Sequence, residues 1–203
     1  CQGRFDGAEA HVLEIIRLLP LAEQVELRPY GLGHALFFAV NLSLREEAET
    51  LLGLMENGAW RAGLEKAEYC YMMCEYHAYT DRSSPDMIAW SRRGLAELDR
   101  AGSLQTVQAA NLHHAQALGW AYAGNTEEAQ AHFDEFSRLY QAWFGNTDAL
   151  AFAVLDNSLG IAFYQAGDYH SALPRFTSAL QRVRRAGTGD SHLAQSYLGN
   201  ISN

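Results

Sequence analysis

The chain has 203 residues, 48% hydrophobic and 19% charged, the balance of an ordinary globular protein with one domain or one compact array. Its 15 basic and 24 acidic residues give a formal net charge of −9, so we expect no nucleic-acid binding and no attachment to an anionic membrane, because both require attraction to phosphate groups. Three cysteines without framework spacing, and no apolar run long enough to span a bilayer, indicate a reducing, cytoplasmic compartment and no membrane span.

Apolar residues recur at helical spacing along most of the chain, and Gly, Pro and polar turns separate the runs. This pattern predicts an all-α chain in which the last helix has no partner and the first has its partner upstream, so we expect a fragment of a longer protein. In chain order, the predicted helices span residues 7–19, 29–41, 45–57, 61–79, 86–101, 105–123, 126–143, 148–166, 169–186 and 190–203.

A pattern of about forty residues repeats within this helical chain. Its clearest copy places Leu159, Gly160 and Phe163 on one face of a helix that ends near Gly167. On the next helix, a small residue, a large one and another small one follow at i, i+4 and i+7. The first of these small residues forms a column 40, 41, 40 and 43 residues apart, at Ala8, Ala48, Ala89, Ala129 and Ala172.

The pattern resembles the tetratricopeptide repeat, whose units show Leu-Gly, an aromatic residue, Gly-Asp-Tyr, and then Ala, aromatic and Ala on a second helix. The longer period resembles the repeats of kinesin light chains and of bacterial LuxR-type multidomain regulators. The resemblance implies a right-handed superhelical solenoid of antiparallel helix pairs, in one array covering residues 1–203. Its units would be a partial one at 1–27, four at 28–60, 61–103, 104–146 and 147–188, and a partial one at 189–203.

The third unit departs most from the pattern. His77 stands where a small residue is expected, and Arg93 stands where an aromatic residue is expected. Either its register differs from that of the other units, or the array bends there.

The sequence contains no set of residues with the spacing of a catalytic or metal-binding site. Cys70, Cys74 and His77 share one helical stripe, but zinc needs a fourth ligand, so we expect the two cysteines to pack as small apolar residues. His113 and His114 point about 100° apart on a helix, and we expect the first to pack and the second to face a groove. The sequence therefore predicts no catalytic residues, no metal, no cofactor and no enzyme activity.

The resemblance implies that the first helix of each pair lines a concave groove. Its columns mix uncharged polar, aromatic and aliphatic residues, which suits a bound peptide or partner helix. They hold no Lys or Arg, so we do not expect the C-terminal carboxylate ligands of chaperone adaptors. The residues predicted to contact a ligand are Phe37, Cys74, His114, Asn157, Tyr164 and Asn200.

The leading hypothesis is a non-enzymatic scaffold or sensor segment that binds a protein or peptide in the groove, cut from a larger bacterial protein. A second hypothesis makes the array the regulatory part of a signalling enzyme or of a DNA-binding regulator, where an occupied groove controls the attached effector domain. A third is a homodimer through the terminal helices at 7–19 and 190–203, whose apolar faces lack a partner.

Overall fold

The computed structural model describes residues 8–18, 28–41, 44–58, 60–80, 83–145, 149–187 and 192–202. Within them the regular secondary structure is α-helix throughout, which confirms the all-α prediction, and each predicted helix end lies within three residues of the observed one. The helices are α1 (Ala8–Leu18), α2 (Arg28–Asn41), α3 (Arg45–Glu56), α4 (Leu64–Tyr79), α5 (Ser84–Arg100), α6 (Val107–Tyr122), α7 (Thr126–Phe144), α8 (Ala149–Gln165), α9 (Tyr169–Arg185) and α10 (His192–Ser202).

Two of the turns between helices are built alike, by glycine and a capping side chain. Gly124 and Gly167 have φ of 74° and 81°, the left-handed conformation that lets a helix end in a tight turn. The next residue then caps the following helix: Asn125 Oδ1 accepts from the Glu128 amide, and Asp168 Oδ1 accepts from the Ser171 amide. These caps fix the short connections α6–α7 and α8–α9.

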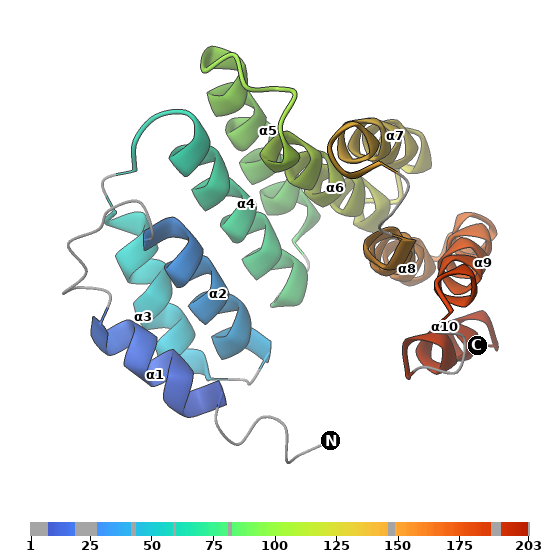
Figure 1. Cartoon of the computed structure of the whole chain (residues 1–203), viewed down its shortest axis with the longest axis horizontal. Coiled ribbons are helices and arrows are strands. Elements are labelled where there is room, and N and C mark those ends of the chain that lie inside the picture. The colour runs from blue at the N-terminus through green and yellow to red at the C-terminus, as the bar shows by residue number, and fades with distance from the viewer. Residues whose placement is uncertain are drawn as a thin grey trace.

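The helices lie along an arc in which even-numbered helices are inside and odd-numbered helices are outside (Figure 1). Neighbours in sequence pack as α2 with α3, α4 with α5, α6 with α7, and α8 with α9. Along the inner side, α2 contacts α4, α4 contacts α6, and α6 contacts α8. The largest hydrophobic cluster runs through α4 to α9, so the core continues from one helix pair to the next.

The repeat column holds in α3, α7 and α9 but not in α5. Ala129, Phe133 and Phe136 are buried, as are Ala172, Phe176 and Ala179, and in α3 Ala48 and Met55 are buried. In α5 the predicted residues Ala89, Arg93 and Ala96 are exposed. Among its buried residues, Met87, Ser91 and Gly94 have the same i, i+4 and i+7 spacing. The predicted register of the third unit is therefore wrong by two residues, and the column passes through Met87. The side chain of Ala8 lies outside the described residues.

Gly94 sits where α5 packs against α4 and α6. A Cβ at this position would lie 2.7 Å from Leu112 Cδ2 and 3.0 Å from Cys70 Cβ, which is closer than carbon atoms pack without movement. Gly53, in α3, offers a matched control, because a Cβ there would meet nothing within 4 Å.

We expect Gly94→Ala to lower the free energy of unfolding by about 1–3 kcal/mol, because the added methyl overpacks a filled interface. Gly53→Ala should raise it by about 0.5–1 kcal/mol, since alanine loses less backbone entropy in a helix. Urea unfolding followed by circular dichroism measures both. Equal effects of the two substitutions would contradict the corrected register of α5.

Candidate functional site

Two of the six predicted groove residues are buried between helices. Cys74 is 0% exposed, and its thiol donates to the Met87 carbonyl oxygen at 3.5 Å. His114 is 5% exposed and packs 5.5 Å from the Phe136 ring, so the prediction that it faces a groove is wrong. The reason is that α6 contacts α8 directly, which covers this side of α6. Burial lowers the pKa of His114 to about 4, so its imidazole is neutral at physiological pH.

Asn157 and Asn200 are brought together across α8 and α10. Asn200 Nδ2 donates to Asn157 Oδ1 at 2.8 Å, and both side chains stay partly exposed. Tyr164, on α8, is 39% exposed, and its ring meets that of Tyr169 edge to face at 5.2 Å. Phe37 lies in α2, but its side chain is outside the described residues. The structure therefore brings Asn157 and Asn200 together, and Tyr164 lies seven residues further along α8, against Tyr169 of α9.

Asn157, Tyr164 and two further residues form a stripe along α8. Val154, Asn157, Ile161 and Tyr164 recur at three- and four-residue steps, and therefore share one helix face. Val154 is 45% exposed, while Asn157 and Ile161 are partly buried. We call these four residues, together with Asn200, the α8 stripe. It carries no charged side chain, so it offers hydrogen bonds and apolar contact rather than ion pairing.

The carboxylate of Asp156, next to this stripe, holds α8 against α9. It is 1% exposed and accepts from Arg175 Nη1 at 3.1 Å, Ser178 Oγ at 2.7 Å and Arg182 Nε at 2.9 Å. Sequence reasoning missed this cluster. Its signals were one carboxylate on an otherwise uncharged helix and donors at 175, 178 and 182 on one face of the next.

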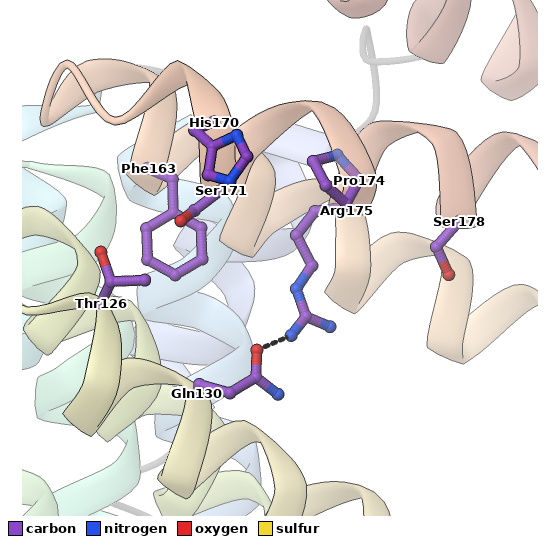
Figure 2. A pocket seen from close by; sticks show the side chains of 8 residues that line it. All are labelled: Thr126, Gln130, Phe163, His170, Ser171, Pro174, Arg175 and Ser178. Carbon is purple, nitrogen blue, oxygen red and sulfur yellow. Dashed lines mark hydrogen bonds between the residues drawn. The ribbon is translucent and has the colours of Figure 1, made fainter.

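A hollow of about 310 Å³ lies beside this cluster, between α7 and α9 (Figure 2). Arg175 borders it and donates to Gln130 Oε1, and its guanidinium carbon lies 4.1 Å from the centre of the Phe133 ring. Its lining residues are Thr126, Gln130, Phe163, His170, Ser171, Pro174, Arg175 and Ser178. Asp156 already neutralises the Arg175 charge, and Ser178 is bonded to the same carboxylate, so neither side chain is free to bind an anion in the hollow.

In the described part of the chain, few side chains are arranged for a role other than packing. Those residues include no group of three or more His, Cys, Asp or Glu side chains arranged to hold a metal ion. None of the described helices is both long and apolar enough to cross a membrane. Comparison with protein-family models, with curated proteins and with solved structures finds no match to this chain.

We expect Asp156→Asn to lower the free energy of unfolding by about 2–4 kcal/mol, because it leaves two guanidinium groups without their buried counter-charge. Asp99→Asn, which changes an exposed carboxylate of α5, should have an effect within about 0.5 kcal/mol. Chemical denaturation of both variants at pH 7 measures the difference. A destabilisation as small for Asp156→Asn as for Asp99→Asn would show that the cluster does not hold α9.

Glu75, on α4 next to Cys74, is a partly buried carboxylate. Burial raises its pKa to about 7, and the hydrogen bond from Tyr71 opposes the rise only in part. The folded state therefore binds a proton more tightly than the unfolded state. Stability consequently falls as pH rises from the unfolded pKa near 4.5 to about 7, and the penalty is complete above that range.

We expect Glu75→Gln to raise the free energy of unfolding by about 1–3 kcal/mol at pH 8, because the amide removes the penalty for a buried charge. The gain should shrink toward pH 4.5, where the wild-type carboxyl is protonated in the folded state and half protonated in the unfolded state. Denaturation curves of both proteins between pH 4.5 and pH 8 test this. Glu127→Gln, at an exposed carboxylate of α7, is the control and should show no such trend.

Proposed function

We propose that this chain is a non-enzymatic helical-repeat scaffold, a tetratricopeptide-like solenoid, that binds a peptide or protein segment along its inner row of helices. The observation that carries the proposal is the α8 stripe on that row, uncharged and partly open. The successive contacts of α2, α4, α6 and α8 support it, because they give an extended ligand a continuous track.

The asparagine pair supplies the hydrogen-bonding groups that a peptide backbone needs. After Asn200 Nδ2 donates to Asn157 Oδ1, Asn157 keeps two N–H donors and Asn200 keeps its carbonyl oxygen as an acceptor. A donor and an acceptor side by side match the C=O and N–H of one residue in an extended peptide, because these two groups point to the same side of the chain. The existing bond between the two side chains fixes both amides, which lowers the entropy lost on binding.

The other members of the stripe supply apolar contact. Val154 and Tyr164 are 45% and 39% exposed, and Ile161 lies between them on the same helix face. The Tyr169 ring packs edge to face against Tyr164, holds that ring in place, and adds aromatic surface beside it. An aromatic anchor beside backbone-directed amides favours a short uncharged or mixed peptide over a phosphorylated or strongly acidic one.

A phage-displayed library of random 12-residue peptides tests the proposal. We expect selection on the wild-type chain to enrich a family of peptides with dissociation constants of about 1–100 μM by fluorescence polarisation. Asn157→Ala and Tyr164→Ala should each weaken binding by about tenfold, as truncation of a central contact does. Gln181→Ala, at an exposed position on outer helix α9, should leave the affinity unchanged.

Two results would contradict the proposed function. One is selection that enriches no peptide family above an unrelated helical control protein. The other is a set of enriched peptides whose affinity is the same for wild type, Asn157→Ala and Tyr164→Ala. Circular dichroism and unfolding midpoints of the variants separate loss of binding from loss of folding.

A further inference from the structure

The chain turns sharply where α3 ends, at Asn57 and Gly58. Asn57 is the C-cap of the helix, and its side chain is exposed. Its Nδ2 donates to the Gly53 carbonyl oxygen at 2.7 Å, and its main-chain N–H donates to the same oxygen at 3.1 Å. The Gly58 N–H donates to the Met55 carbonyl oxygen at 3.3 Å, which is long for a bond of this kind. Four residues of one exposed helix end are therefore joined by three hydrogen bonds.

A glycine directly after an asparagine makes a reaction within the backbone possible. The nitrogen of the following residue can attack the side-chain amide carbon, because the new bond closes a five-membered ring. A side chain on that residue hinders the approach, whereas glycine has none and turns freely about its backbone bonds. Elsewhere in the sequence asparagine is followed by Leu, Thr, Ser or Ile. Asn57 is therefore the asparagine whose neighbour favours ring closure most.

The side chain of Trp60 covers this turn. Its indole Nε1 donates to the Met55 carbonyl oxygen at 2.6 Å, and its main-chain N–H donates to the Gly58 carbonyl oxygen at 3.0 Å. The indole also stacks on the Tyr69 ring of α4, with ring centres 5.6 Å apart and planes at 11°. A Cβ at Gly58 would lie 2.6 Å from Cε2 of this fixed indole, so only glycine fits beneath the ring. Trp60 therefore requires the glycine that makes the asparagine reactive, and it also holds the turn closed.

The closed turn keeps the reacting atoms apart. Asn57 has φ −87° and ψ 0°, so the Gly58 nitrogen points toward the Asn57 main-chain nitrogen and away from its side chain. The attacking N–H and the amide that would leave are both held by carbonyl oxygens of α3. These bonds lie at an exposed helix end, where local opening requires little free energy. The reaction therefore proceeds from a transiently opened turn, and its rate follows the population of that opened state.

We propose that Asn57 is a site of spontaneous deamidation, and that Trp60 sets its rate by holding the end of α3 closed. In the opened turn the Gly58 nitrogen loses its proton to solvent and bonds to Asn57 Cγ. The Cγ–Nδ2 bond breaks, and the amide nitrogen takes up a proton and leaves as ammonia. Water then opens the ring at either carbonyl carbon, which gives aspartate, or isoaspartate with the backbone running through the side chain. One water is consumed and one ammonia is released, so no oxidant or reductant takes part.

Either product weakens the end of α3. A carboxylate at residue 57 cannot donate to the Gly53 carbonyl oxygen, and it places a negative charge at the C-terminus of the helix, next to the exposed Glu56. Isoaspartate also lengthens the backbone before Gly58, which moves the glycine from its place beneath Trp60. The reaction uses none of the residues of the α8 stripe, so deamidation and peptide binding can be tested separately.

The experiment incubates the full chain for several weeks at pH 7.4 and 37 °C in buffer made with H₂¹⁸O. Peptide mapping with electron-transfer mass spectrometry follows every asparagine and separates aspartate from isoaspartate, and the solvent label excludes conversion during digestion. We expect Asn57 to convert at least about tenfold faster than any other asparagine, with isoaspartate among its products. In the chain unfolded by guanidinium chloride, Asn57 should convert at least about tenfold faster than in the folded chain, because the turn is then always open.

Trp60→Phe tests the role of the tryptophan, because it keeps a ring over Gly58 and removes the indole N–H. Conversion of Asn57 in the folded variant should rise about two- to tenfold, the effect of losing one hydrogen bond from the closed turn. Trp143→Phe is the matched control and should leave the rate unchanged, since Trp143 Nε1 donates in the same way to the Gln105 carbonyl oxygen, far along the chain. Asn111, within α6, reports opening of the whole chain and should not accelerate.

Four results would overturn the proposal. Asn57 could convert no faster than Asn111 in the folded chain, or it could give aspartate alone, which indicates direct hydrolysis without ring closure. Its rate could be equal in the folded and unfolded chains, a comparison that needs no substitution. Trp60→Phe could match Trp143→Phe, or accelerate Asn57 and Asn111 alike, and either outcome would show that Trp60 does not control this turn.

Discussion

Four other helices, α4, α5, α7 and α8, pack against helix α6 and bury it. The arrangement of the described chain depends on the burial of this helix. Its sequence contains no Asp, Glu, Lys or Arg, and alanine or glycine supplies most of its buried positions, so its neighbours approach closely on several sides. The burial also has an unfavourable part, since His114 Nε2, Gln116 Oε1 and Trp120 Nε1 lie inside without a hydrogen-bond partner. Apolar contact across four interfaces outweighs these three atoms.

Close approach of helices is preserved along the chain, but the small residue that permits it changes sides. A Cβ at Gly160 of α8 would lie 2.7 Å from the Phe176 ring of α9. At this contact the small residue is on the inner helix and the large residue is on the outer helix. Gly94 reverses this arrangement, because it lies on outer helix α5 and faces Leu112 of α6. The combined volume at each contact is what packing constrains. A column of residue identities in one chain does not reveal such an exchange, so the sequence predicts Ala89 at the buried position that Met87 occupies.

Helix number, helix ends and the pairing of neighbours could be predicted because they depend on local features. Apolar periodicity, glycine at left-handed turns and side-chain caps such as Asp168 act within a few residues of one another. The candidate sites depend instead on which helix surfaces remain uncovered. His114 and Asn157 occupy the same predicted column 43 residues apart, yet one is buried under α8 and the other meets Asn200 beside open surface. The Asp156 cluster likewise joins two helices through side chains that sequence spacing does not relate.

The distribution of charge between the two layers sets the kind of ligand that the proposed binding by the inner row would favour. Helices α6, α8 and α10 carry one charged residue among them, Asp156, and that carboxylate is buried against Arg175 and Arg182. The net acidity of the chain therefore does not come from the inner helices of its C-terminal half. Attraction between a charged ligand and the outer layer is screened by salt, whereas the hydrogen bonds and apolar contacts offered by fixed amides and an aromatic ring depend little on salt. The proposed recognition on the α8 stripe would consequently rest on backbone hydrogen bonds and apolar area, which discriminate ligands by shape and sequence rather than by charge.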